Sequence, residues 1–321
     1  MKALVAGIVL LCAQPALAQA AFSPPRTSDG RPDLQGYWLS GFITPVERPD
    51  KLSTLVIPAD QQAAALAMMT AMNDEGEVYD PEKDYNPLPA VLLELDGEMR
   101  SSQIVEPADG KLPLTSLAKA ALDQFSFNFD DPEGRPSSER CMDGLVNAPI
   151  AGLPLLIPLQ LVQTADAIVL AMEDMEPVRI VSFAAPHSSR TRSGHSLGRW
   201  EGDTLIVETS QFAITDRAGL TFRGAGVPVT SDSRVIERFR LTSPDTILYQ
   251  FTVEDPSLYS APWRAEFLLR RTTHAVYEYA CHEGNRSMIH ILTAARLGRQ
   301  TKKERDEQKL AAEKQTAAAP E

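Results

Sequence analysis

The stretch SRVIERFRL (Ser233–Leu241), the pair Pro244-Asp245 and the stretch TILYQFTVE (Thr246–Glu254) decide the fold of this chain. Both stretches are rich in Val, Ile, Thr and aromatic residues, which favour β-strands, and the Pro-Asp pair between them is typical of a tight turn. Similar runs of about five to nine residues recur on either side of them. These runs are Leu159–Gln163, Ala167–Met172, Val178–Phe183, His195–Trp200, Asp203–Thr209, Trp263–Leu269 and Ala275–Cys281.

The connections between these runs are short and contain Gly, Asp, Asn or Pro, as in Glu201-Gly202. Connections of this length join antiparallel neighbours and leave no room for crossover helices. The sequence therefore predicts a mainly β fold, in which an antiparallel meander closes into a barrel or a strongly curved sheet. An earlier strand is predicted at Leu34–Trp38. Its Trp38, close behind Gly36, either packs across a barrel end or is an ordinary core residue.

A few peripheral helices are predicted around this sheet. Pro58–Met72 has Pro58 before the first turn, Asp60 as a capping residue and an interior of alanines and methionines. Leu114–Phe127 is a second candidate, with Thr115 or Ser116 as its cap. The end of the chain, Thr301–Glu321, is rich in Lys, Glu, Gln and Ala, and predicts a charged tail that begins as a solvated helix.

The first residues have the pattern of a signal peptide. Lys2 is followed by the apolar run Ala3–Cys12 and by the small-residue site Ala16-Leu17-Ala18. The run is about half as long as a membrane-spanning helix. We expect cleavage near Ala18, a periplasmic or secreted location, one β-rich domain over residues 19–300 with a helical N-terminal part, and a tail over residues 301–321.

The net charge is strongly negative. The formal charge is −12, and it becomes −13 after loss of residues 1–18, in which Lys2 is the one charged side chain. An acidic chain with no basic patch is a poor partner for nucleic acid or anionic lipid, and no later apolar run is long enough to span a bilayer. The sequence gives no indication of oligomeric state.

Two cysteines remain after processing, Cys141 and Cys281. In an oxidising compartment such an isolated pair predicts a disulfide, and two buried free thiols are the alternative. The bridge would close a loop of about 140 residues, which contributes at most about 5 kcal/mol in the chain-entropy description.

Three segments together resemble a large, mostly uncharacterised family of secreted β-rich proteins of Gram-negative bacteria. They are GHSLGRWEGDTL (Gly194–Leu205), DPSLYSAPW (Asp255–Trp263) and YEYACHEGN (Tyr277–Asn285). The resemblance covers roughly residues 140–296 and implies secretion, a β-rich core and pairing of the two cysteines. The chain departs from the family where Met142-Asp143-Gly144 replaces a Pro-Pro-Gly turn, and at His195, which is often Tyr.

The YEYACHEGN segment also carries the strongest candidate for chemistry. A disulfide at Cys281 would fix a strand end, so that His282 and Glu283 project at the mouth of the sheet, where a carboxylate can orient an imidazole for acid–base catalysis. His195 is the third candidate catalytic residue. Tyr259, Trp263, Tyr279 and Asn285 are the candidate substrate-binding residues, because inward-facing aromatics of a barrel line its pocket. The alternative is that His282 and Glu283 only satisfy loop backbone groups.

Other site types are disfavoured by the sequence. His195-Ser196 lacks the strand-to-helix elbow of a serine hydrolase. His187, His195, His282 and His290 show none of the spacings of strong metal sites, so no metal is predicted. Glycine-rich phosphate cradles are absent, so no nucleotide or other organic cofactor is predicted.

Three functions follow from these observations. The first is a cofactor-independent periplasmic enzyme, a lyase, isomerase or hydrolase, that performs acid–base chemistry on a small aromatic or apolar molecule. The second is a lipocalin-like periplasmic carrier of such a ligand. The third is an envelope structural or assembly factor that docks through the charged C-terminal segment.

Overall fold

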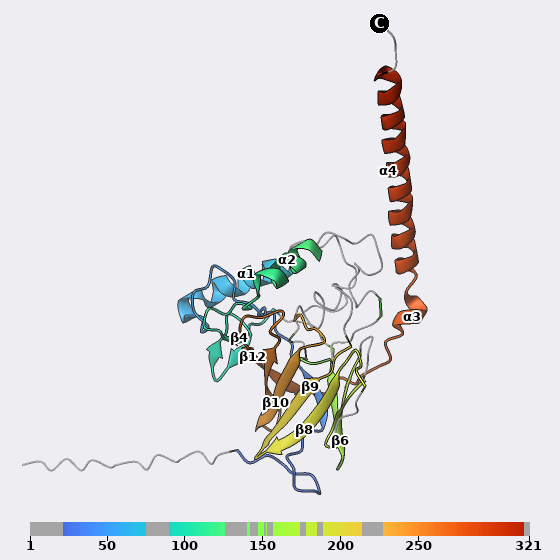
Figure 1. Cartoon of the computed structure of the whole chain (residues 1–321). Helices are drawn as coiled ribbons and strands as arrows, with labels where there is room; N and C mark the ends of the chain where they lie inside the picture. Colours follow the sequence, from blue (N-terminus) through green and yellow to red (C-terminus); the bar gives the residue numbers. More distant parts are fainter. Residues whose placement is uncertain are drawn as a thin grey trace, which may run out of the picture.

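Nine strands close into a barrel, which confirms the mainly β prediction (Figure 1). The computed structural model describes residues 22–74, 90–125, 140–141, 147–150, 152, 157–173, 178–184, 189–213 and 227–317. The barrel strands are β1 (Gly36–Leu39), β5 (Leu159–Gln163), β6 (Ala167–Met172), β7 (Val178–Ser182), β8 (His195–Glu201), β9 (Thr204–Ser210), β10 (Arg234–Ser243), β11 (Thr246–Glu254) and β12 (Trp263–Thr272). They pair in this order, and β12 pairs back with β1 to close the ring.

Eight of the nine neighbouring pairs are antiparallel, and the pair β7–β8 is parallel. This differs from the predicted uniformly antiparallel meander. The cause is the link Phe183–Gly194, which is about a dozen residues long and therefore long enough to return the chain to the end where β7 began. The parallel seam is short, since only Val181 and Ser182 pair with β8, at Ser196 and Leu197.

Shorter elements surround the barrel. The helices are η1 (Ala59–Gln61), α1 (Gln62–Asp74), α2 (Ser116–Phe125), α3 (Cys281–Gly284) and α4 (Ser287–Ala317), and the remaining strands are β2 (Glu94–Leu95), β3 (Glu98–Met99) and β4 (Ile104–Glu106). Strand β4 pairs with β12 at Arg264 and Ala265, on the edge opposite β11, and β2 pairs with β3. Both predicted helical regions before the barrel are confirmed, and the predicted helical tail begins earlier than expected, at Ser287.

The barrel interior is filled by alternate side chains of its strands. Along β11, Ile247, Tyr249, Phe251 and Val253 are buried while the residues between them are partly exposed. Aromatic rings from neighbouring strands contact one another: the ring centroids of Phe239 and Tyr249 lie 4.9 Å apart. The interior is therefore a packed core.

One end of the barrel is closed by the lead-in to β1. Trp38 is fully buried there, its indole N–H donates to the carbonyl of Leu34 at 3.0 Å, and the Arg271 guanidinium lies 4.3 Å from its ring centroid. A Cβ at Gly36 would collide with the Arg271 side chain, so this glycine makes the approach possible. Trp38 also belongs to the main buried cluster of the barrel, so the two predicted roles of this residue coincide.

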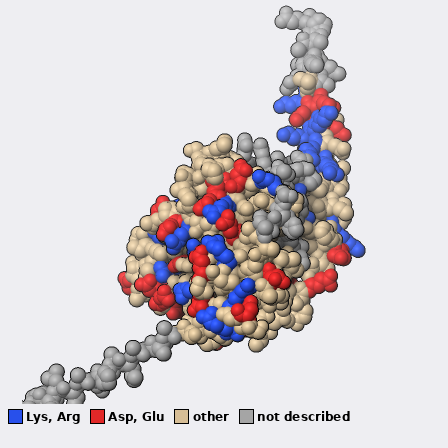
Figure 2. Space-filling model, turned by 60° about the horizontal axis from the view of Figure 1, so that its bottom comes forward, with Lys and Arg blue, Asp and Glu red and all other residues tan. Residues whose placement is uncertain are grey.

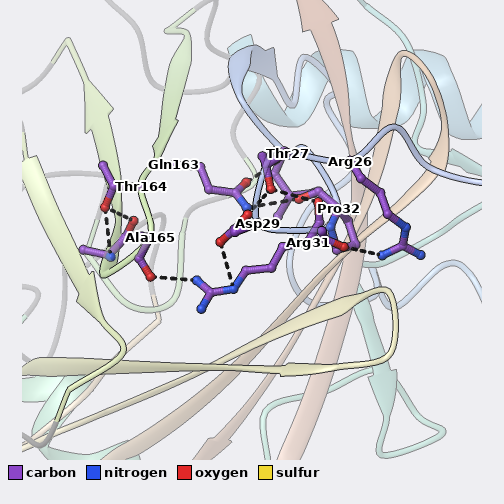
Figure 3. Close-up of polar contacts among 11 residues, drawn as sticks. Arg26, Thr27, Asp29, Arg31, Pro32, Gln163, Thr164 and Ala165 are labelled. Carbon is purple, nitrogen blue, oxygen red and sulfur yellow. Dashed lines mark hydrogen bonds and ion pairs between the residues drawn. The ribbon is translucent and has the colours of Figure 1, made fainter.

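The loop before this strand is held by polar contacts to the turns at the same end (Figure 3). Arg26 forms an ion pair with Asp203 of the β8–β9 turn at 2.7 Å. Figure 3 shows the contact of Arg31, which donates to the carbonyl of Ala165 in the β5–β6 turn at 2.9 Å. The Arg31 guanidinium also lies over the ring of Phe183 at 4.5 Å. These contacts tie the start of the described chain across the barrel end.

The two ends of the described chain differ in their packing. In Figure 1 helices α1 and α2 are both drawn with the body of the molecule, whereas α4 extends away from it. Helix α1 buries Ala65 and Met69 against Ile43 and Ile57. In α4, Ile289, Leu297 and Leu310 remain exposed.

One predicted strand is wrong. Ala275–Cys281 forms no strand, and Cys281 instead begins helix α3. The residues Val276, Tyr277 and Tyr279 suit a strand by composition, but no strand edge is available beside β12. One edge of that strand pairs with β11 over residues 263–270. The other edge pairs with β1 at residues 270–272 and with β4 at Arg264 and Ala265, and next to β4 the Glu266 N–H donates to the carbonyl of Gln103.

Candidate functional site

The predicted catalytic residues His282 and Glu283 lie on α3, outside the barrel strands, and both are exposed. The predicted Cys141–Cys281 disulfide is formed, with a Cα–Cα distance of 5.9 Å. The Asn285 amide donates to the Cys141 sulfur at 3.3 Å. The bridge therefore anchors the start of α3, but it does so on a short exposed helix and not at the end of a strand.

His195, the third predicted catalytic residue, comes from a different element. It is the first residue of β8, it is half-buried, and its Nε2 hydrogen-bonds with the carbonyl oxygen of Ser189. Because a carbonyl only accepts, Nε2 carries the proton in this contact. The neighbouring Ser196 hydroxyl is buried and hydrogen-bonds with the Thr209 hydroxyl at 2.8 Å. This contact pairs Ser196 with a threonine of β9.

The four predicted substrate-binding residues are divided between the core and the surface. Tyr259 and Trp263 are buried, with ring centroids 5.7 Å apart, and the Tyr259 hydroxyl donates to the carbonyl of Pro228 at 2.7 Å. Tyr279 is exposed and Asn285 is half-buried beside the disulfide. Tyr259 and Trp263 thus belong to the packed core, while the other two lie with α3.

Burial also dominates the electrostatics of that aromatic pair. It raises the pKa of the Tyr259 hydroxyl well above its ordinary value, and the nearby Trp263 indole N–H offsets part of the rise, although it makes no hydrogen bond of regular geometry. A tyrosine held neutral and bonded to a backbone carbonyl serves as a structural donor.

A buried charged network inside the barrel was not anticipated from the sequence. The Arg179 Nη2 donates to both carboxylate oxygens of Glu237 at 2.9 Å, and both side chains are almost completely buried. The Tyr249 hydroxyl donates to Glu237 at 2.7 Å and accepts from the backbone N–H of Ile150 at 2.8 Å. The signal in the sequence was Glu237, which occupies an inward position between Val235 and Phe239 in SRVIERFRL.

Burial raises the pKa of Tyr249 well above its usual range, and the Glu237 carboxylate raises it further. The hydroxyl therefore stays protonated and keeps its donor role toward Glu237. The Nε and Nη1 atoms of Arg179 are buried and have no hydrogen-bond partner. A buried ion pair of this kind contributes little net stability, because the cost of removing both charges from water offsets their attraction. It restricts how the interior side chains can pack.

Asp255 forms a second buried polar cluster, at the end of β11. Its Oδ2 accepts from the hydroxyls of Thr230 at 2.5 Å and Ser233 at 2.6 Å, and its Oδ1 accepts from the hydroxyl of Ser257 at 2.6 Å. Burial acts to raise the pKa of Asp255, but the hydrogen bonds from Ser233, Ser257 and Thr230 outweigh it, and the pKa is lowered. The cluster joins the loop before β10 to the loop after β11 through donors to one carboxylate.

A cavity of about 470 Å³ lies outside the barrel, between α1 and the outer face of β12. It is lined by residues 40–42 after β1, Gln62, Ala63 and Leu66 of α1, residues 90–94 leading into β2, Met99 of β3, and Leu268 and Arg270 of β12. Most of these side chains are apolar. The cavity volume lies within the usual range for small-molecule pockets, about 300–1,000 Å³.

The cavity stays open because the buried residues of α1 pack into a separate cluster and do not fill it. Ala65 and Met69 pack into a small separate cluster with Ile43 and Ile57, and Leu66 and Met99 border that cluster. Ala63, one turn earlier, is left facing the open space. The sequence carried no signal for this pocket, because its walls come from four segments that only the tertiary fold brings together.

Charged side chains of both signs are interspersed over the face of the molecule in Figure 2. Within the described ranges, no group of three or more His, Cys, Asp or Glu side chains is placed to share a metal ion. No helix in the described part of the chain is long and apolar enough to cross a membrane.

Comparison with known proteins identified no relative: no protein-family model matches the chain, and no curated protein matches its sequence. The resemblance noted in the three segments between Gly194 and Asn285 stays a prediction. Any functional assignment has to come from the geometry described above.

Proposed function

We propose that the protein is a carrier that binds a small apolar molecule in the cavity between α1 and β12. The observation that carries this proposal is the cavity itself, which is large enough for a small ligand and is lined mainly by Ala, Leu, Val, Met and Phe side chains. The barrel core, in contrast, is filled by its own side chains.

A pocket of this kind favours binding over catalysis. The three predicted catalytic residues do not line it, since the described residues of its walls include no histidine and, as an acid, only Glu94. Burial of apolar ligand surface supplies the binding free energy, about 25 cal/mol per Å² removed from water.

The test is to fill the cavity with a side chain. Ala63 lines the cavity and is exposed, so Ala63→Trp adds bulk there without disturbing the core. Ala64→Trp is the matched control, because the neighbouring Ala64 is also exposed on α1 but does not line the cavity. The probe is naphthylmethanol, a neutral aromatic molecule whose fluorescence reports binding.

We expect saturable binding to the wild type and to Ala64→Trp, and binding at least about tenfold weaker to Ala63→Trp, which corresponds to about 1.4 kcal/mol. The proposal fails if the wild type shows no saturable binding, or if the two tryptophan variants bind alike. Incubation with mixed lignin-type aromatics and terpenoids, followed by mass spectrometry, separates carriage from turnover. Retention without product supports the carrier.

An acid–base enzyme that uses His282 and Glu283 is the second candidate. The disulfide at Cys281 supports it, because the bridge anchors the residue immediately before this pair. The conversion of a retained compound by wild type, and its loss in His282→Ala, would favour the enzyme.

The site of action that we propose is the periplasm or the exterior of the cell. The Cys141–Cys281 disulfide supports this, because such bridges persist in oxidising compartments. The signal peptide predicted for residues 1–18 lies outside the described residues. Intact mass and N-terminal sequencing of exported protein test it, with cleavage expected near Ala18.

A further inference from the structure

The three arginines of β12 differ in their partners. Arg264 forms an ion pair with Glu106 at 3.2 Å. Arg271 donates to the carbonyls of Pro244 at 3.2 Å and Gln35 at 3.1 Å, and packs over a tryptophan ring. Arg270 makes no ion pair or side-chain hydrogen bond with any described residue, and it is the arginine that lines the cavity between α1 and β12.

The other polar groups of the cavity do not take up this guanidinium. The Gln62 amide already donates to the carbonyl of Ile57 at 3.3 Å. Glu94 lines the cavity and is exposed, but it forms no ion pair with Arg270 in the described structure. The donors of Arg270 are therefore available to a bound molecule in a cavity whose lining is mainly apolar.

We propose that Arg270 binds the carboxylate of the molecule held in this cavity, so that the ligand is an apolar compound carrying one carboxylate. The proposal rests on the carrier function proposed above. A planar guanidinium presents paired donors that match the two oxygens of a carboxylate, and it is always charged. The apolar walls hold the body of such a molecule while the charged group remains near solvent, where it keeps most of its hydration.

The Glu94 carboxylate weakens the proposed binding of a ligand carboxylate but does not prevent it. Its repulsion of a ligand carboxylate acts through solvent, because Glu94 is exposed, and is screened by salt. The contact with Arg270 is direct and formed by hydrogen bonds to a charged group. Glu94→Gln is accordingly expected to tighten binding of a carboxylate and to leave the binding of a neutral probe unchanged.

The experiment compares naphthoate with naphthylmethanol, which share a ring system and differ in the charged group. Each is titrated into wild type, Arg270→Gln, Arg270→Lys and Arg264→Gln. Arg264 is the matched control because it lies on the same outer face of β12 but does not line the cavity. Circular dichroism establishes that each variant is folded.

We expect the wild type and Arg264→Gln to bind naphthoate at least about tenfold more tightly than naphthylmethanol. Arg270→Gln should lose this preference by weakening naphthoate alone, and Arg270→Lys should retain part of it because it keeps the charge but lacks the planar fork. Added salt should weaken naphthoate more than naphthylmethanol.

The outcomes separate this inference from the carrier function. If both probes bind with equal affinity, or if Arg270→Gln leaves naphthoate binding unchanged, the carboxylate inference is overturned while the carrier function stands. If neither probe binds, or Ala63→Trp fails to weaken either, both are overturned. Arg270 is exposed, so its replacement is not expected to prevent folding. If an Arg270 variant fails to fold, the inference is tested by the affinities of the wild type for naphthoate and naphthylmethanol.

Discussion

The barrel interior and the cavity beside it use their charged groups in opposite ways. Inside the barrel, Arg179, Glu237 and Tyr249 are bonded to one another and to the backbone of Ile150. In the cavity, Arg270 and Glu94 have no such contacts within the described part of the chain. The bonded groups are used up within the core and the unbonded groups are available to a ligand, so the charged side chains of this molecule have structural and binding roles in separate regions.

The first way to break this comparison is to remove one member of the buried pair. Arg179→Met leaves the Glu237 carboxylate buried without its cation, and we expect a loss of about 3–5 kcal/mol in the free energy of unfolding. The partly exposed Arg234, which pairs with Glu208 at 2.7 Å and with Glu254 at 2.9 Å, is the control, and Arg234→Met should cost at most about 1 kcal/mol for each pair. Urea denaturation measures both.

A paired replacement sharpens this prediction. Arg179→Met combined with Glu237→Gln leaves no lone charge and keeps an acceptor for the Tyr249 hydroxyl, so it should be less destabilising than Arg179→Met alone. Naphthylmethanol binding by the folded protein should be unchanged in both. Equal destabilisation by the single and double variants would contradict a role based on charge pairing.

The second prediction concerns acid stability. The pKa of Asp255 is lowered in the folded state, so its contribution to stability is present above its unfolded pKa of about 4 and is lost as the pH falls through the folded value. Asp255→Asn should cost about 1–3 kcal/mol at neutral pH, because several buried donors lose a charged acceptor. The loss should shrink as the pH falls below about 4.

Unfolding free energies measured between neutral and acid pH test this. Asp245→Asn is the control, since Asp245 is exposed and, within the described part of the chain, its carboxylate makes one long ion pair, with Arg271 Nε at 3.6 Å. An Asp255→Asn variant whose deficit stays constant with pH would show that the hydrogen bonds do not depend on the ionised carboxylate.

Much of the barrel could be predicted from the sequence, because the strands after Leu159 are rich in β-favouring residues and several of them, such as β8–β9 and β10–β11, are joined by short turns. The prediction failed at Ala275–Cys281, where a strand-like composition met a sheet already closed by the β1–β12 pairing. Closure depends on partners distant in the sequence, which composition does not report. The parallel β7–β8 seam was missed for a different reason, because the link of about a dozen residues between these two strands is long enough for a return in either direction and composition does not report which one the chain takes.

The candidate site was less predictable than the fold. The disulfide followed from the compartment and the cysteine count, and it is confirmed. The cavity could not be predicted from the sequence, because residues 40–42, residues 90–94, helix α1 and strand β12 come together only in the folded protein. Arg270 and Arg271 are neighbours of the same type in the sequence, and only their tertiary contacts distinguish a ligand-facing side chain from a structural one.

The third prediction uses that pair of arginines. Arg271→Gln removes a guanidinium stacked on Trp38 and bonded to two carbonyls, and it should lower the free energy of unfolding by about 1 kcal/mol without changing naphthoate binding. Arg270→Gln should do the reverse, weakening naphthoate with a stability change within about 0.5 kcal/mol. Thermal melts and titrations of the two variants side by side provide the measurement. If both change stability equally, the division between structural and binding residues on β12 is wrong.

The smallest effect is expected at the residues that the sequence favoured most. His282 and Glu283 are exposed on α3, and neither lines the cavity. If the protein is a carrier, His282→Ala and Glu283→Gln should each change the free energy of unfolding by less than about 0.5 kcal/mol and leave naphthylmethanol and naphthoate affinities unchanged.

If the protein is an acid–base enzyme at this pair, removal of a positioned acid or base should instead lower turnover by about a hundred- to ten-thousandfold. Turnover is measured on any compound that the wild type converts in the mixed-aromatic incubation. The neighbouring exposed Arg286→Gln serves as the control for a general effect of altering this region. A loss of turnover in both variants, with the control unaffected and the fold intact, would transfer the function from the cavity to α3.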